Sequence, residues 1–100
     1  YFTLGPAAPD TWREVDLVSH AVTGRVNGGP PRDGRGANVL GDPCVALTWL
    51  ANELSGLGLT LHRGEVVTTG TCLVPLPVKA RDVVRADFGT LGVIEIQFGD

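Results

Sequence analysis

The strongest chemical signal in the sequence is the run Thr69-Gly70-Thr71, at the end of a β-branched stretch. Gly70 interrupts the strand expected there, and an isolated glycine in a strand often marks a bulge or a ligand that approaches the backbone closely. The flanking hydroxyls and backbone N–H groups are donors suited to a small carboxylate. The residues alone leave both interpretations open, an ordinary bulge and a carboxylate-binding strand end.

A second candidate is the glycine-containing segment Gly34-Arg35-Gly36. Its backbone N–H groups and the Arg35 guanidinium could bind an anion together. Glycines in such segments more commonly serve tight turns. A tight turn before a helix is therefore the interpretation that we favour from the residues alone.

The acidic and histidine side chains give little support for a metal site. Glu14 and Asp16 are the closest acidic pair, whereas a hard cation needs several converging carboxylates, so we expect a solvated strand edge. His20 and His62 have no partner at zinc-ligand spacing. We expect His62 to be exposed in a turn and His20 to be packed or hydrogen-bonded in a strand.

The sequence also offers no strong nucleophile. Ser19 and Ser55 lack a nucleophile-elbow context. Cys44 lies in the first turn of a predicted helix, where the helix dipole could lower its pKa, although packing in the core is the better interpretation. Cys72 follows a loop glycine and could border a pocket.

Composition narrows the class of protein. The chain has 100 residues, 43% hydrophobic and 19% charged, with a net charge of -3, which suits one globular domain. Seven scattered arginines and one lysine make no stripe for nucleic acid, and no apolar run approaches the ~20 residues that span a bilayer. Two isolated cysteines favour a reduced, cytoplasmic setting. Because residue 1 is Tyr rather than Met, we expect the chain to begin within a longer protein, after processing, or after a cut.

One helix and several strands must position these groups. A helix over about residues 43–56 is indicated by Asp42 as its cap, Pro43 in its first turn and Gly56 at its end. Its apolar residues fall on one stripe, which we expect to be buried. That stripe consists of Leu47, Leu50, Ala51 and Leu54.

The strand signals predict an α+β, mainly β domain. Asn27-Gly28 is a strong hairpin signal, and Pro30-Pro31 should keep the return strand short. The remaining predicted elements are a strand from Val15 to Val26, a buried strand over 66–69, a turn over 79–82, and strands over 83–88 and 93–98 that Gly89 to Gly92 join as a hairpin.

The order of motifs resembles the carboxy-terminal part of the 2-oxopent-4-enoate (vinylpyruvate) hydratases, in the fumarylacetoacetate hydrolase superfamily. The similarity runs along essentially the whole chain, residues 1–100, as the carboxy-terminal portion of a hydratase-like catalytic domain. It is carried by Val39-Leu40-Gly41-Asp42-Pro43, Trp49-Leu50-Ala51-Asn52, Gly64-Glu65-Val66-Val67, Thr69-Gly70-Thr71 and Pro77-Val78-Lys79-Ala80.

This resemblance implies the mixed β-roll of that superfamily, with strands around the pocket and the helix packed outside. It implies a hydro-lyase that adds water to 2-hydroxy-2,4-dienoates in the meta-cleavage catabolism of aromatic compounds. Mg²⁺ or Mn²⁺ would serve as a Lewis acid. The metal-binding carboxylates and an important lysine of the family would lie upstream, outside this chain, so this segment alone is expected to be inactive.

The resemblance also assigns binding roles. Gly70 and Thr71 would contact the carboxylate of a small 2-oxo or 2-hydroxy-dienoate acid, with Thr69 near. Arg35, with Gly34 and Gly36, would lie near the same cleft. A homo-oligomer, or association with the missing amino-terminal half, would cover the apolar surface that a fragment exposes.

The chain departs from the family pattern at four places: Gly24 within a strand, Pro30-Pro31, Val45, and Arg81 where a turn glycine is usual. Other functions stay open. Within the superfamily they are a 2-oxo-3-enedioate (4-oxalocrotonate-type) decarboxylase and an acylpyruvate hydrolase. Outside enzymes, the alternative is a non-catalytic β module or subunit.

Overall fold

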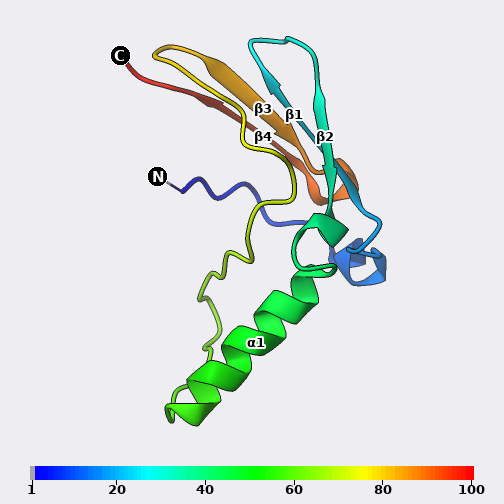
Figure 1. Cartoon of the computed structure of the whole chain (residues 1–100), viewed down its shortest axis with the longest axis vertical. Helices are drawn as coiled ribbons and strands as arrows, with labels where there is room; N and C mark the ends of the chain where they lie inside the picture. Colours follow the sequence, from blue (N-terminus) through cyan, green and yellow to red (C-terminus); the bar gives the residue numbers. More distant parts are fainter. Residues whose placement is uncertain (1) are drawn as a thin grey trace.

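The computed structural model describes residues 2–100 as one antiparallel sheet, one long helix and extended irregular segments (Figure 1). The strands lie in the order β2-β1-β3-β4. The α+β, mainly β class with one main helix is thus confirmed. The elements in chain order are η1 (Asp10–Glu14), β1 (Ala21–Val26), β2 (Arg32–Arg35), η2 (Gly36–Asn38), α1 (Pro43–Gly56), β3 (Val83–Asp87), η3 (Gly89–Leu91) and β4 (Val93–Gln97).

Both predicted hairpins are present. Asn27 and Gly28 have φ of 52° and 69°, and the N–H of Gly29 donates to the carbonyl of Val26 at 2.9 Å. Positive φ at both central residues matches the twist of the strands that the turn connects. After Pro30-Pro31, β2 is four residues long, as predicted. Strands β3 and β4 are joined through η3, with Gly89 and Gly92 at positive φ.

The sheet has an apolar and a polar face. Residues paired across antiparallel strands share a face, so the rows Val26–Val84–Ile96 and Gly24–Ala86–Ile94 lie on the same side. On the opposite face, Arg85 and Glu95 approach to 3.7 Å with both side chains exposed. This alternation is typical of an antiparallel sheet with one face in solvent.

Two irregular segments cover the apolar face. A Cβ on Gly24 would lie 2.9 Å from Cδ1 of Leu76, and a Cβ on Gly5 would lie 2.7 Å from Cγ1 of Ile94. Gly24 therefore leaves room for the 73–76 segment to pack on β1. Among residues 2–100, the buried hydrophobic side chains are Val22 and Val39, which are 6% and 5% exposed.

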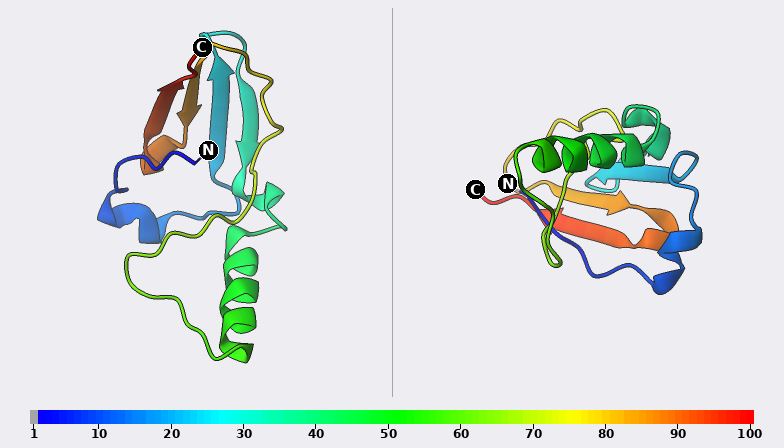
Figure 2. Two further views of the ribbon diagram at one scale, coloured as in Figure 1. Left: turned by 90° about the vertical axis from the view of Figure 1, so that its left-hand side faces the viewer. Right: turned by 90° about the horizontal axis from the view of Figure 1, so that it is seen from below.

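Helix α1 begins and ends where the sequence predicts. The carboxylate of Asp42 accepts a hydrogen bond from the N–H of Cys44 at 2.8 Å, and Gly58 follows the helix with φ of 76°. The predicted burial of its apolar stripe is wrong: Leu47 is 40% exposed, and no helix residue is fully buried. The helix extends away from the sheet (Figures 1 and 2), so no described element covers that stripe.

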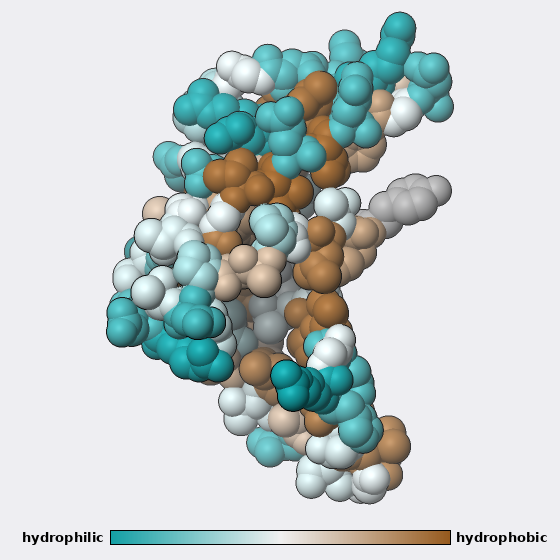
Figure 3. Space-filling view, turned by 180° about the vertical axis from the view of Figure 1, so that it is seen from behind, coloured by the Kyte–Doolittle hydropathy of each residue, from teal (hydrophilic) through white to brown (hydrophobic). Residues whose placement is uncertain are grey.

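The whole surface reflects this open arrangement. The accessible area is 7528 Å², whereas a compact monomer of this mass exposes about 5400 Å² by the usual scaling. Figure 3 shows apolar residues at the surface over both the sheet-bearing part and the helical part. Large exposed side chains include Phe2, Leu4, Trp49, Leu57, Leu59, Val66 and Val74. In the part of the chain that the structure describes, no helix has the length and apolarity to cross a membrane.

The start of one predicted strand and the existence of another are corrected. The carboxylate of Asp16 accepts hydrogen bonds from the N–H of Val18 at 3.2 Å and the hydroxyl of Ser19 at 2.8 Å, which forms a local turn, so β1 begins at Ala21 rather than Val15. The segment 66–69 is not a strand, and Val66 is 56% exposed. Its β-branched residues have no neighbouring strand among residues 2–100 to pair with, and strand preference depends on such packing.

Candidate functional site

A cavity of about 260 Å³ lies between β1, the start of α1, the 69–72 segment and the β3–β4 connection. Its polar side chains are His20, Thr69 and Cys72. Backbone is presented by Gly36 and Gly70. The remaining wall is apolar, made by Leu17, Val22, Val39, Pro43, Phe88 and Leu91. An apolar pocket with a few polar groups is the usual form of a small-molecule site.

Two of the four predicted binding residues line this cavity. Thr69 is half-buried, and Gly70 has φ of 120°, a conformation that glycine adopts far more readily than other residues. A Cβ on Gly70 would lie 3.6 Å from Val39, an ordinary contact, so backbone conformation rather than space requires the glycine. Thr71 and Arg35 are exposed and do not line the cavity.

The 69–72 segment is fixed to the sheet by Cys72. Its carbonyl accepts hydrogen bonds from the N–H of Arg35 at 3.2 Å and from the side-chain amide of Asn38 at 2.7 Å. A Cβ on Gly34 would collide with the same carbonyl. Gly34 and Arg35 belong to strand β2, so the expected tight turn at 34–36 is wrong, and Gly34 instead permits close approach of two backbones. The expectation that Cys72 borders a pocket is confirmed.

His20 is a cavity residue to which sequence reasoning assigned no function. Its Nε2 lies 2.6 Å from the carbonyl oxygen of Phe88, and its side chain is half-buried. The prediction that His20 is hydrogen-bonded is thus confirmed. It lies just before β1 rather than within a strand. Phe88 directly follows β3, which pairs with β1, and only this long-range pairing brings the two together.

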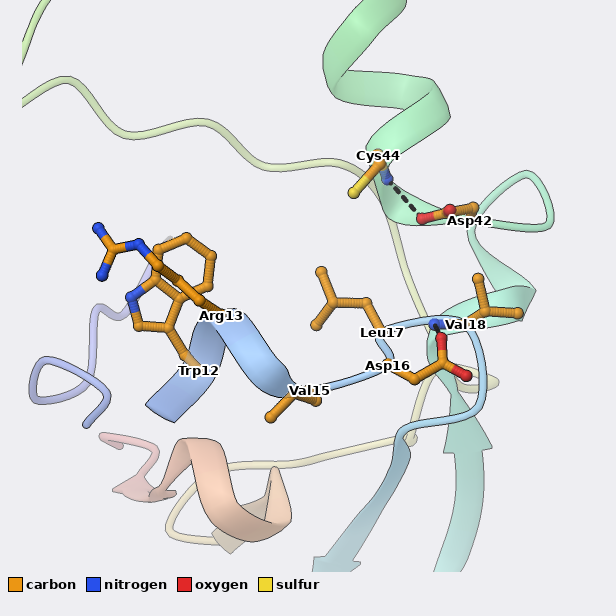
Figure 4. A pocket seen from close by; sticks show the side chains of 8 residues that line it. All are labelled: Trp12, Arg13, Val15, Asp16, Leu17, Val18, Asp42 and Cys44. Carbon is orange, nitrogen blue, oxygen red and sulfur yellow. Dashed lines mark hydrogen bonds between the residues drawn. The ribbon is translucent and has the colours of Figure 1, made fainter. Parts of the chain in front are cut away.

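A second cavity, of about 290 Å³, lies between η1 and the start of α1 (Figure 4). The Arg13 guanidinium stacks 4.7 Å from the ring centroid of Trp12 at its edge. Cys44 is exposed here, not packed in a core. The negative charge of Asp42 beside it, together with a hydrogen bond to that carboxylate, raises the pKa of the Cys44 thiol, opposite to the expected effect of the helix dipole.

The donor set of this chain does not fit a metal site. Within residues 2–100, His, Cys, Asp and Glu side chains form no group of three or more that could hold an ion. His62 is 73% exposed, as expected, and its Nδ1 pairs with Glu65 at 2.7 Å. Asp16 is engaged with its own turn.

Comparisons with known proteins point to one family. Residues 1–98 match the family described as fumarylacetoacetate (FAA) hydrolase C-terminal. A 2-keto-4-pentenoate hydratase of Burkholderia vietnamiensis is 36% identical over 97% of this chain, which corresponds to 37% of that relative. A 2-hydroxyhexa-2,4-dienoate hydratase of Comamonas testosteroni is 33% identical over 97% of the chain and 36% of the relative.

A third relative, a 2-oxo-hept-4-ene-1,7-dioate hydratase of Escherichia coli, is 31% identical over 93% of the chain and 34% of its own length. The chain thus spans slightly more than a third of the length of the curated relatives that it matches. The substrates named for these relatives differ in the tail beyond the conjugated acid, whereas the carboxylate and its 2-oxygen are common to all of them.

Proposed function

Because this chain belongs to the fumarylacetoacetate hydrolase C-terminal family, we propose that it forms one wall of the substrate pocket in a hydratase. The reaction is addition of water to a 2-hydroxy-2,4-dienoate, giving a 4-hydroxy-2-oxo acid. The proposal extends to the whole protein the activity that its relatives carry in their names. It places the protein in the catabolism of aromatic compounds, in a cytoplasmic setting that suits its two free thiols.

The observation that carries this proposal is the position of Thr69 and Gly70 in one wall of a mainly apolar cavity. None of the residues that line the cavity carries an acidic or a permanently cationic side chain. A carboxylate bound there would depend on neutral donors, which are the Thr69 hydroxyl and backbone N–H groups near Gly70. The apolar residues would hold the carbon chain, and about 260 Å³ suits a short acid rather than a large ligand.

Thr71 and Arg35 stay in the proposal with different roles. Thr71 directly follows Gly70, so its N–H belongs to the same stretch of backbone even though its side chain is exposed. Arg35 is exposed on β2, one residue from Gly36 of the cavity wall. We assign Arg35 to attraction of the acid toward the cleft rather than to direct contact.

The metal belongs to another part of the protein in this proposal. Since the described residues offer no adequate donor group, the ligands for Mg²⁺ or Mn²⁺ would come from sequence outside this chain. The bound ion would supply Lewis-acid chemistry. The contribution of this chain is to bind the acid, keep its carbon chain out of water and orient its 2-oxygen.

The exposed apolar side chains of helix α1 also imply a partner. The exposed side chains of Leu47 and Trp49 on α1 are those that a second copy or the rest of the protein would cover. An apolar surface of this extent is typical of an interaction site.

The test is a replacement chimera. The part of the Burkholderia vietnamiensis relative that matches this chain is replaced by residues 1–98, and the chimera is assayed with 2-hydroxypenta-2,4-dienoate and Mg²⁺. Loss of the ultraviolet band with formation of 4-hydroxy-2-oxopentanoate supports the proposal. This chain alone is the matched control and should be inactive.

Other products would contradict the hydratase proposal. Release of CO₂ from a 2-oxo-3-enedioate by the chimera would favour a decarboxylase, and C–C cleavage would favour an acylpyruvate hydrolase. A folded chimera that turns over none of these substrates would favour a non-catalytic module.

A further inference from the structure

We infer that His20 is a ligand-binding residue of the 260 Å³ cavity and that its Nδ1 accepts a hydrogen bond from the 2-hydroxyl of the bound acid. The inference rests on the proposed function, because it assumes that a 2-hydroxy-dienoate occupies this cavity. It adds a residue and a selectivity: preference for the 2-hydroxy form of the acid over its 2-oxo form.

The hydrogen bond to Phe88 fixes which nitrogen carries the proton. A backbone carbonyl can only accept, so Nε2 of His20, 2.6 Å from the Phe88 oxygen, must be the donor. In a neutral imidazole the other nitrogen, Nδ1, is then an acceptor with a free lone pair. The backbone therefore sets the tautomer before any ligand arrives.

Nδ1 is free to serve a ligand. It has no hydrogen-bond partner among residues 2–100, where the contact with Phe88 is the one hydrogen bond of this side chain. It is also not an enclosed, unsatisfied atom, because the described part of the chain has no buried side-chain nitrogen or oxygen without a partner. An unpartnered acceptor on a half-buried ring at a cavity wall can accept a hydrogen bond from a bound acid.

The ring is held in place as well as oriented. Gly89 lies close, since a Cβ there would be 3.4 Å from both Cε1 and Nε2 of His20. Gly89 has φ of 60° in the β3–β4 connection, so the turn brings its backbone against the imidazole edge. A ring fixed on one edge loses little freedom when the opposite edge binds, which favours affinity.

The cavity offers hydrogen-bond donors for the carboxylate and an acceptor for the 2-hydroxyl on the neighbouring carbon. Thr69 and the backbone near Gly70 supply donors for the carboxylate, whereas Nδ1 supplies an acceptor. A 2-hydroxyl donates to that lone pair, but a 2-oxo group offers a second acceptor and leaves Nδ1 unpaired. A site built to pair with a hydroxyl discriminates against an analogue that lacks one.

The experiment compares three small acids on this chain as it stands: 2-hydroxypentanoate, 2-oxopentanoate and pentanoate. Binding is followed at about pH 8, where imidazoles are mostly neutral, through the amide shifts of Thr69 and Gly70 in heteronuclear NMR spectra. We expect 2-hydroxypentanoate to bind about 5-fold more tightly than the other two acids, the effect of one neutral hydrogen bond. The imidazole nitrogen spectrum should show the Nε2–H form in the free protein.

Two substitutions separate binding from structure. His20→Gln places an amide donor where Nε2 stands, so it keeps the hydrogen bond to Phe88. It removes the acceptor from the position of Nδ1. His20→Asn places its amide near the Nδ1 position and loses the Phe88 bond. In His20→Gln the three acids should bind with equal affinity, and the amide spectrum should remain that of the wild type.

Each outcome is decisive. If Thr69 and Gly70 shift with all three acids and the wild type shows no preference, His20 does not read the 2-hydroxyl, although the proposed site survives. If His20→Gln keeps the preference, or if His20→Gln weakens all three acids by the same factor, the role of His20 is structural and the inference is overturned. If no acid moves the Thr69 and Gly70 amides, the proposed function fails at this cavity and the inference fails with it.

Discussion

The side-chain amide of Asn27 donates to Oδ1 of Asp82 at 2.8 Å, which joins residues 55 positions apart. Asn27 Oδ1 in turn accepts from the N–H of Val83 at 2.8 Å, and Asp82 Oδ2 accepts from the N–H of Lys79 at 2.9 Å. Asp82 is 6% exposed. This pair fastens the β1–β2 turn to the start of β3, the strand that carries Phe88 to His20.

The first prediction concerns acid stability. The hydrogen bond from Asn27, then that from Lys79, lowers the pKa of Asp82 below its ordinary value. A carboxyl with a lowered folded-state pKa stabilises the fold fully above the unfolded pKa of about 4, and this contribution is lost as pH falls through the lower folded pKa. We expect the wild type to lose its stability advantage over Asp82→Asn across that acid window, measured by urea unfolding.

Asp33→Asn is the matched control, because Asp33 is an exposed carboxylate on β2. It should leave the acid profile close to that of the wild type. A constant difference between wild type and Asp82→Asn down to the lowest pH would show that the ionised carboxylate is not what stabilises the turn.

The second prediction concerns Arg81, which lies in the turn before β3. Arg81 has φ of 68°, and a left-handed conformation costs a non-glycine residue roughly 1–2 kcal/mol. Glycine relieves this strain but loses more conformational entropy on folding, which offsets part of the gain. We therefore expect Arg81→Gly to raise the free energy of unfolding by about 0.5–1 kcal/mol. Equilibrium urea unfolding measures the change.

Arg81→Ala separates strain from charge. It removes the same guanidinium, whose 3.6 Å approach to Asp100 is solvent-exposed on both sides and contributes little. Because alanine keeps the strain, Arg81→Ala should leave stability nearly unchanged. Equal gains in the two variants would indicate that the arginine side chain, not its backbone conformation, is unfavourable.

Local signals predicted the fold where the structure is local. The cap at Asp42 and the glycines near residue 56 define α1, and Asn27-Gly28 defines the β1–β2 turn, because each depends on backbone preferences within a few residues. The segment 66–69 fails for the opposite reason. Its β-branched residues favour an extended backbone, but a strand also needs a partner at its edge.

The candidate site shows the same division. Gly70 was predicted because a glycine inside a β-branched run is visible in the sequence. His20 received no role because its partner Phe88 is 68 positions away and only the pairing of β1 with β3 brings them together. One signal in the sequence points to a contact of this kind. It is a polar residue beside a predicted strand, when a predicted hairpin elsewhere in the chain could pair with that strand.

The third prediction concerns close backbone approach at Gly36. A Cβ at this position would collide with the carbonyl of Leu17, which is backbone and cannot rotate away. We expect Gly36→Ala to destabilise the fold by about 1–3 kcal/mol, the range for overpacking, measured by thermal and urea unfolding. Gly56→Ala is the control, because nothing lies within 4 Å of that position, and it should be neutral or mildly stabilising. Equal stability of the two variants would contradict this packing.

The fourth prediction concerns the exposed apolar side chains of helix α1. Trp49 is 63% exposed and Leu47 is 40% exposed, and apolar surface of this kind favours association. We expect light scattering after size-exclusion chromatography to give a mass above the 10.5 kDa of one chain. The variant Leu47→Gln with Trp49→Gln should shift the mass toward the monomer. A wild type that remains monomeric at high concentration would show that these exposed side chains do not drive association.

The last prediction uses Asp42, which both caps α1 and faces the Cys44 thiol. Its charge and its hydrogen bond raise the pKa of that thiol, so Asp42→Asn and Asp42→Ala should both lower it and speed alkylation by iodoacetamide, since the thiolate is the nucleophile. Asn caps a helix as well as Asp, whereas Ala costs about 1 kcal/mol, so only Asp42→Ala should lose stability. Cys72, which lines the other cavity and forms no hydrogen bond with Asp42, is the internal control for general unfolding. Faster alkylation of both cysteines would mean that the fold has loosened, and unchanged alkylation of Cys44 would mean that Asp42 does not control its thiol.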